Sequence, residues 1–389
     1  MCPMETEEDD SGGCDFLDWL GPDTSTTVFE LLDDPADLAR VGAVSRSWRR
    51  FVTENEFSKR LCRRICPEAA SFTRAVVVTR SPPPPQPAAS ASESSQDAEC
   101  RAREGEHAAY SYLAGAIVSA KPAMDLIMRC VGASSTDFFP DESMENTLVP
   151  HEWVNHRHSY WSSGGKDNPD APESLTYRLS SDLCVIDEIR VRPYKAAFQL
   201  GHPIYSSKAV RIRLGHSKLD PGTETFVSAE NENLTAIADE NYTWTYTSPE
   251  FPMLQENVLQ TFKLPRPALC IGGIVKIELL GRLQKQSTDD KYYICVCHVQ
   301  VMGRSLSPDL MIDISDPADY SNLKYLPGAG NLRPEDLLSS DAKEDSSDWR
   351  SLVSRYRQMR QLAMVYMLLG PVQFADEEDE AEADMLHLL

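Results

Sequence analysis

The sequence is short of positive charge, and this shortage excludes one group of partners. Its 389 residues include 38 Lys and Arg against 60 Asp and Glu, so the formal net charge is −22 at pH 7. Proteins that bind nucleic acid or an anionic membrane surface need a basic patch to meet the phosphates. We therefore expect no nucleic-acid partner and no membrane partner.

Long apolar runs and an export signal are also missing. No segment approaches the roughly 20 apolar residues that span a bilayer. The first residues, "MCPMETEEDD", are acidic and lack the apolar stretch of a secretory signal. The ten cysteines are scattered and suggest no disulfide framework. We expect them to be thiols in a reducing compartment, the nucleus or the cytoplasm.

Short catalytic motifs are absent as well. The sequence has no G-x-S-x-G elbow, no H-E-x-x-H and no dinucleotide fingerprint, and "SSGGKD" lacks the spacing of a phosphate-binding loop. His151, His156 and His158 match no zinc template. We therefore expect no cofactor, no metal site and no catalytic residue, and the chain is predicted not to be an enzyme.

What is present divides the chain into helical and β-rich parts, so the predicted fold class is α+β. A Pro-, Ser- and Ala-rich stretch separates them, because such a composition buries too little apolar surface to fold. The predicted parts are a disordered acidic N-terminus (1–14), three to four short helices (15–67), a disordered linker (80–103), a helical connector (104–131), an antiparallel β-sandwich or jelly roll (132–304), a C-terminal helix (346–370) and an acidic tail (375–389).

The N-terminal helices have recognisable start signals. Ser25 is placed to cap one helix, Asp34 with Pro35 to begin the next, and Ser45 to cap a third. About fifty residues in short helices make only a small core. The helical spacing leaves two alternatives open: the apolar strip is buried by a partner, or it packs on the rest of the chain.

The helical region combines Asp37-Leu38, Val44-Ser45 and Trp48 within "LGPDTSTTVFELLDDPADLARVGAVSRSWRRFVTENEFSKRLC". In this combination it resembles an F-box of the plant type. The sequence departs from the family at Gly21, where Leu is usual, and at Phe57-Ser58, where Leu-Trp is common. The resemblance implies docking on a Skp-type adaptor and, through it, on a cullin, with Trp48 and Phe51 in the F-box core. The residues it assigns to adaptor binding are Pro22, Val28, Leu31, Leu32, Leu38, Val41 and Val44.

From about residue 134 the apolar residues alternate with polar ones, as in strands that are buried on one face. Val210, Ile212 and Leu214 show this pattern, whereas "YYICVCHVQV" is apolar on nearly both faces and is predicted to be a central strand. About eight such strands are expected. Cys295 and Cys297 are predicted to share one face of that strand.

The β-rich part contains, in this order, "GASSTDFFPDESMENTL", "YWSSGGKDNPD", "SLTYRLSSDLCVIDEIRVRPY", "KAVRIRLG" and "YYICVCHVQVMG". In the order and spacing of these segments it resembles the discoidin or galactose-binding-like jelly roll. Folds of this class bind ligands through loops at one end of the sandwich. The candidates for binding a target or ligand are His151, Trp153, His156, His158, Tyr160, Phe198, His202 and Tyr205. For Trp161 we favour a place in the core.

Together these resemblances predict the substrate-recognition subunit of a Skp–cullin–F-box ubiquitin ligase. The F-box would dock on the adaptor, and the sandwich would capture a protein target, with or without glycans. The alternative is a glycan- or glycoprotein-binding F-box protein in quality control. The residues alone do not decide between a sugar and a peptide as ligand.

Overall fold

A computed structural model describes residues 15–78, 95–154, 157–219, 238–314 and 321–331. These residues belong to one compact unit, Met1–Leu332. The predicted acidic N-terminus, most of the predicted linker, the predicted C-terminal helix 346–370 and the acidic tail lie outside the described residues.

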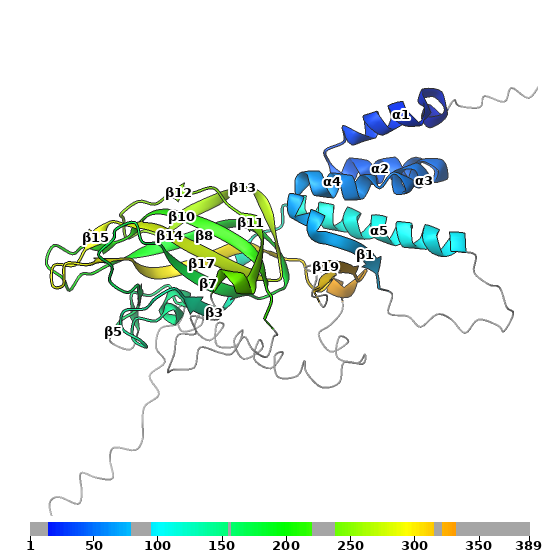
Figure 1. Cartoon of the computed structure of the whole chain (residues 1–389). Helices are drawn as coiled ribbons and strands as arrows, with labels where there is room; N and C mark the ends of the chain where they lie inside the picture. The colour runs from blue at the N-terminus through cyan, green and yellow to red at the C-terminus, as the bar shows by residue number, and fades with distance from the viewer. Residues whose placement is uncertain (1–14, 79–94, 155–156, 220–237, 315–320, 332–389) are drawn as a thin grey trace, which may run out of the picture. The chain divides into compact units, whose positions relative to one another are not determined.

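The described part of the chain begins with short helices, and two of the three predicted start signals are confirmed (Figure 1). Asp34 caps the second helix by accepting a hydrogen bond from the Ala36 amide at 2.8 Å, and Ser45 caps the third by accepting one from the Trp48 amide at 3.1 Å. The helices are α1 (Phe16–Glu30), α2 (Pro35–Val44), α3 (Arg46–Glu54), α4 (Phe57–Ile65) and the 3₁₀ turn η1 (Pro67–Ser71).

The predicted cap at Ser25 is wrong. Ser25 lies inside α1 and is buried. Helix α1 is kinked at Gly21, whose φ of 74° is open to glycine without strain, and its second part begins with Pro22. A proline suits the first position of a helix because its missing N–H has no partner there in any case.

The predicted linker and connector need two corrections. Helix α5 (Ser95–Val118) begins within the stretch 80–103 that was predicted to be disordered. Its first turns are rich in strong helix formers, and the ion pair between Glu99 and Arg103, 2.6 Å apart, lies at i, i+4 spacing. The end of the predicted helical connector 104–131 is not helical: it forms the two strands β2 (Met124–Asp125) and β3 (Ile127–Ala133), and β3 pairs with β7 (Glu173–Leu179).

The sandwich consists of two antiparallel sheets of six strands each (Figure 1). One has the order β11-β10-β14-β7-β3 with β12 beside β10; the other has the order β13-β8-β17-β2 with β6 beside β17 and β9 beside β8. The strands of the first sheet are β3 (Ile127–Ala133), β7 (Glu173–Leu179), β10 (Ser207–Ser217), β11 (Tyr242–Thr247), β12 (Phe251–Pro252) and β14 (Ile274–Arg282). Those of the second are β2 (Met124–Asp125), β6 (Trp161–Ser162), β8 (Leu183–Lys195), β9 (Ile204–Tyr205), β13 (Gln260–Ile271) and β17 (Cys295–Ser305).

The alternating apolar residues form the core between these sheets. Val210 and Ile212 of β10 lie opposite Leu279 and Ile277 of β14, and all four are buried. The prediction of an antiparallel sandwich is confirmed, and β17 is the buried strand that was expected. Trp161 is fully buried in this core, as favoured.

The remaining elements are short. Two strand pairs form small hairpin-like extensions. Strand β1 pairs in parallel with β19, and paired residues there lie 248 or more positions apart in the sequence, so no local pattern predicted this pairing. The elements are β1 (Phe72–Val77), η2 (Met144–Leu148), β4 (Trp153–Val154), β5 (Arg157–His158), η3 (Asp239–Asn241), β15 (Gln284–Lys285), β16 (Tyr292–Tyr293), β18 (Leu310–Asp313), β19 (Ser321–Tyr325) and η4 (Ala329–Asn331).

A second apolar core joins the helical region to the sandwich. The alternation along β8 divides its side chains: Cys184 and Ile186 enter the sandwich core, whereas Leu183 and Val185 pack with α5. Tyr110 of α5 is buried in the same cluster. The helices are therefore fastened to one end of the sandwich.

An ion pair strengthens this junction. Glu68 of η1 is buried and accepts two hydrogen bonds from Arg266 of β13, at 2.5 and 2.9 Å. Two parallel hydrogen bonds between a guanidinium and a carboxylate fix the orientation of the two side chains as well as the distance between them. We call this contact and the shared apolar cluster the junction.

Candidate functional site

The helical region has a small core of its own, formed by aromatic and aliphatic side chains from all four helices. Trp48 and Phe51 pack against it, as predicted, and the Trp48 indole donates a hydrogen bond to the Asp15 carboxylate at 2.7 Å. Leu38 was predicted to bind the adaptor, but it is only 4% exposed and belongs to this core. The prediction for Leu38 is therefore wrong. The buried members are Phe29, Leu38, Val52, Phe57 and Leu61.

Other apolar side chains of the same helices remain outside the core. Leu31 is 75% exposed and Val44 is 61% exposed. We call the exposed members Trp19, Val28, Leu31 and Val44 the apolar set. Among the other predicted adaptor-binding residues, Pro22 is exposed, whereas Leu32 and Val41 are half-buried against the core.

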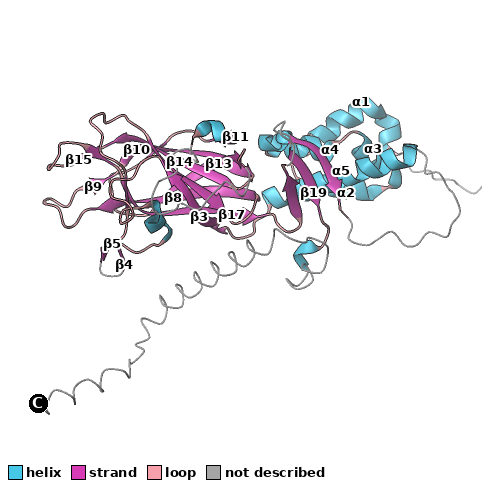
Figure 2. Cartoon of the chain, turned by 60° about the horizontal axis from the view of Figure 1, so that its bottom comes forward, coloured by secondary structure: helices cyan, strands magenta, loops and turns pink. Residues whose placement is uncertain are grey.

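A cluster of aromatic side chains lies at the end of β8 that is away from the junction. Tyr194 lies nine residues beyond Val185 on this strand, which corresponds to about 30 Å at the usual rise per residue. Its ring stacks on Tyr160 with centroids 3.9 Å apart, and its hydroxyl lies 2.5 Å from Nδ1 of His158. Strands β4, β5, β9 and β15 lie at this end of the sandwich (Figure 2).

The rim of the cluster brings together three of the predicted ligand-binding residues. The His158 ring lies 4.0 Å from that of Trp153 and 5.0 Å from that of Phe198, between centroids. Trp153 and Phe198 are each more than half exposed. Exposed aromatic rings on a rigid scaffold are common anchors for ligands.

Below the rim is a cavity of about 140 Å³, which we call the loop-end pocket. Its lining combines tyrosines with carboxylates. Burial raises the pKa of the Glu142 carboxyl, and the hydrogen bond that this carboxyl accepts from the Tyr160 hydroxyl opposes the shift. Burial also raises the pKa of Asp137. The lining residues are Asp137, Glu142, Tyr160, Ser162, Tyr194, Ala196, Phe198, Gln199, Tyr205, Gln286, Tyr293 and Cys295.

A buried ion pair supports the loops around this pocket. Arg282 contacts Glu173, and neither side chain is more than 2% exposed. The guanidinium also donates to the carbonyls of Gly164 and Tyr292, each at 2.8 Å, and to the carbonyl of Ala171 at 3.1 Å. These bonds tie the segment after β6 to the strand that carries Tyr293.

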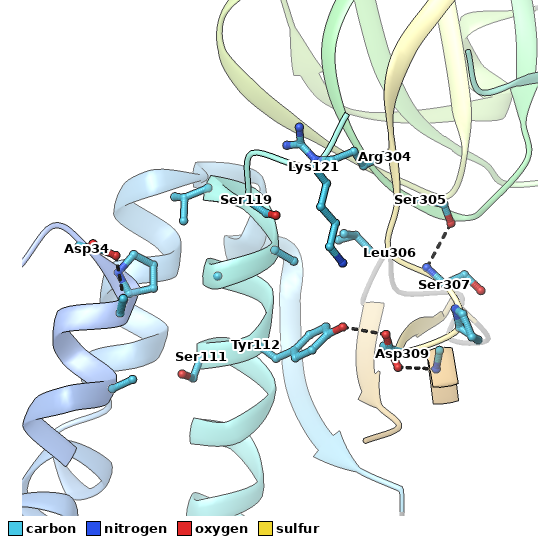
Figure 3. Close-up of a pocket in the computed structure, with 18 residues that line it drawn as sticks. Asp34, Ser111, Tyr112, Ser119, Lys121, Arg304, Ser305, Leu306, Ser307 and Asp309 are labelled. Atoms are coloured by element: carbon cyan, nitrogen blue, oxygen red, sulfur yellow. Dashed lines mark hydrogen bonds between the residues drawn. The ribbon is translucent and has the colours of Figure 1, made fainter. Parts of the chain in front are cut away.

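The larger cavity, about 780 Å³, lies where α2, α5 and the segment after β17 meet (Figure 3). Tyr112 points from α5 across this cavity and donates a hydrogen bond to Asp309 at 2.7 Å, and Asp309 also accepts one from the Gly330 amide at 2.7 Å. These hydrogen bonds connect elements near the junction. Among the residues that line this cavity, no serine or lysine side chain is hydrogen-bonded to a base, so the lining shows no activated serine or lysine of the kind used in catalysis.

The comparisons with known proteins support the F-box resemblance of the helical part. Residues 22–64 match the F-box-like family model. Over 384 residues the chain is 39% identical to F-box protein At4g00755 of Arabidopsis thaliana, which covers 95% of this chain and 100% of that protein. The chain belongs to the F-box protein family.

The sandwich of this F-box protein also has similar solved structures, at low similarity. A family 32 carbohydrate-binding module of C. perfringens NanJ in complex with galactose is 11% identical with a TM-score of 0.27, covering 44% of this chain and 90% of that one. A fucolectin from Morone saxatilis (striped bass) serum is 11% identical with a TM-score of 0.29, covering 48% of each chain.

The F-box protein does not bring all the predicted ligand-binding residues together. Tyr160 and Tyr205 line the pocket, whereas His151 is exposed and has no described contact with it. His202 is exposed and contacts a lining residue through its amide, which donates to the Gln199 carbonyl at 3.0 Å, and His156 lies outside the described residues. Sequence reasoning missed Tyr194, Tyr293, Asp137 and Glu142. Tyr194 and Tyr293 lie at strand ends, where alternation could have marked them.

Within the described parts of the chain, no group of three or more His, Cys, Asp and Glu is arranged to hold a metal ion. No helix there combines the length and apolar character needed to cross a membrane. The eight described cysteines are free thiols, and burial raises the pKa of Cys297 to about 11.

Proposed function

We propose that this F-box protein is the substrate-recognition subunit of a Skp–cullin–F-box ubiquitin ligase. One observation carries the proposal: the F-box core is complete without the apolar set, which stays exposed. Exposed large apolar side chains on a small domain favour burial by a partner. The partner is a Skp-type adaptor, and through it a cullin, in the nucleus or the cytoplasm.

The junction suits this role mechanically. A receptor works by raising the concentration of its target near the conjugating enzyme, and a rigid mount restricts where the target is held. Leu183, Val185 and the pair of Glu68 with Arg266 fasten the F-box to the sandwich. In this proposal the protein itself carries out no chemical step.

The loop-end pocket and its aromatic rim are the proposed site of target capture. Trp153 and Phe198 offer exposed anchors, and Arg282 holds the loops behind them in place. The same rings would also suit a sugar. A glycan array and a binding assay with target peptides therefore separate the alternative, glycoprotein recognition, from capture of a peptide.

Co-purification with a Skp-type adaptor tests the proposed function. We expect the paired substitution Leu31→Asp with Val44→Asp to weaken adaptor binding at least about thirtyfold, as for loss of an interface hot spot. Both side chains are exposed, so the melting temperature should hardly change.

The chain offers a matched control in Leu254→Asp with Val258→Asp. These side chains are 58% and 50% exposed and lie on the sandwich. Equal adaptor binding by the two double variants would contradict the proposed interface.

A further inference from the structure

We propose that the loop-end pocket binds the positively charged head group of a lysine or arginine side chain on the target protein. This inference rests on the proposed function, because it names the chemistry by which the receptor selects its target. It draws on three features of the pocket: its charge, its hydrogen-bonding groups, and its size and aromatic rim.

The charge of the pocket is one-sided. Asp137 and Glu142 line it, and no Lys or Arg is among the lining residues. Asp289 lies outside the lining and accepts a hydrogen bond at 2.5 Å from the hydroxyl of Tyr293, which is a lining residue. Lys291, outside the lining, is the positive group that acts on Asp137.

The carboxylates would gain from a cation. Burial and then the charge of Asp289 raise the pKa of Asp137, while Lys291 opposes them. Burial likewise raises the pKa of Glu142. Raised pKa values of this origin mean that the ionised carboxylates have lost hydration without full compensation. A bound ammonium or guanidinium would supply the missing charge.

The hydrogen-bonding groups also favour a ligand that only donates. The Tyr160 hydroxyl donates to Glu142, that of Tyr293 to Asp289, and that of Tyr205 to Gln199 at 2.6 Å. With these donors engaged, the pocket offers mainly oxygen acceptors, apart from its two glutamine amides. Lysine and arginine head groups donate hydrogen bonds and accept none, whereas a sugar hydroxyl does both.

Size and shape match one side-chain head group. The cavity of about 140 Å³ is well below the roughly 300 Å³ at which pockets for drug-sized ligands begin. Aromatic faces attract cations, and Phe198 lies at the lining while Trp153 extends the rim beside His158. The exposed rings leave room for the backbone of the target to remain outside.

Binding of short peptides by the full-length protein tests this inference. The probes are fluorescein-labelled Gly-Gly-Xaa-Gly-Gly peptides, in which Xaa is Arg, Lys, citrulline or acetyl-lysine, and free galactose is a separate arm. We expect the Arg or the Lys peptide to bind at least about tenfold more tightly than its neutral counterpart, as for a charge-assisted hydrogen bond.

Two variants sharpen the test. Glu142→Gln keeps an acceptor for the Tyr160 hydroxyl, so it should fold, and it should remove most of this preference for charge. Phe198→Ala removes an exposed ring and should weaken binding about threefold. The control Glu250→Gln changes an exposed carboxylate that lies 3.4 Å from Arg211, away from the pocket, and should leave the preference intact.

Several results would overturn the inference: binding of neither cationic peptide more tightly than its neutral counterpart, a preference unchanged in Glu142→Gln, or binding of galactose alone. Absence of binding by every cationic peptide would overturn it as well. Adaptor co-purification is measured separately, so the proposed function can stand when this inference fails.

Discussion

The two exposed surfaces of this F-box protein differ in chemistry. The apolar set consists of aliphatic side chains and one tryptophan and includes no charged residue, whereas the loop-end pocket combines tyrosines with Asp137 and Glu142. Burial of the first would gain from the hydrophobic effect, which has little directional preference. The second is suited to selecting a ligand by charge and hydrogen bonds. This difference fits the proposed roles, in which the apolar set binds the same adaptor each time and the loop-end pocket selects the target.

The same contrast exists inside the F-box, between residues that hold it together and residues that remain outside. Leu38→Asp puts a charge into the core and leaves a cavity, so it should cost at least about 4 kcal/mol of unfolding free energy. Leu31→Asp, seven residues earlier, should cost less than about 0.5 kcal/mol. Urea unfolding checks both, and similar losses would remove the distinction between core and apolar set.

At the other end, the support of the pocket can be broken without touching its lining. Arg282→Met leaves Glu173 buried and unpaired, which should cost about 3–4 kcal/mol. The double variant Arg282→Met with Glu173→Gln should recover part of this loss, because no buried charge then remains. Thermal unfolding measures both variants, and a double variant less stable than the single one would refute the ion-pair account.

The connection between the surfaces can be weakened separately. Arg266→Met removes both hydrogen bonds to the buried Glu68 and should cost about 2 kcal/mol, since Arg266 itself is partly exposed. Arg60→Met, which breaks the exposed pair with Glu30, should cost about 0.5 kcal/mol or less. Hydrogen exchange should show faster opening of η1 and β13 only in Arg266→Met.

The smallest expected effect concerns acid sensitivity at the contact of α4 with α5. His107 lies 2.9 Å from the Ser58 hydroxyl, and its pKa is lowered by burial and then by Arg49, with Glu104 opposing. Below the ordinary pKa of 6.5 the unfolded chain takes up the proton first, so stability should fall as the pH falls.

His107→Gln should reduce this loss between pH 7.5 and pH 5.5 in urea unfolding. The exposed His151→Gln serves as the control for the loss of a histidine. An identical pH dependence in both variants would show that His107 does not contribute.

Much of this architecture could be predicted from local patterns. The caps at Asp34 and Ser45 and the alternation of Val210 with Ile212 depend only on neighbours in the sequence, and the structure confirms them. Leu38 was misassigned because helical periodicity marks an apolar stripe without distinguishing its core side from its exposed side. The sequence alone could not show which side is covered.

The pocket was harder to predict, because its parts are distant in sequence. Glu142 comes from a turn, Tyr194 from the end of β8, and Tyr293 from β16, which immediately precedes β17 in the chain. The pairing of β8 with β17, which places Pro193 opposite Val296, brings the last two positions to the same end of the sheet. The start of α5 at Ser95 was missed for another reason: the composition of 80–103 as a whole concealed the helix formers at its end.

The most direct test of the account is the dissociation constant of the full-length protein for a Skp-type adaptor, measured for the two matched double variants. The account predicts that Leu31→Asp with Val44→Asp loses at least about thirtyfold in affinity. It also predicts that Leu254→Asp with Val258→Asp binds like the unmodified protein. Full adaptor affinity in the first variant, with its melting temperature unchanged, would contradict the claim that the apolar set is the docking surface.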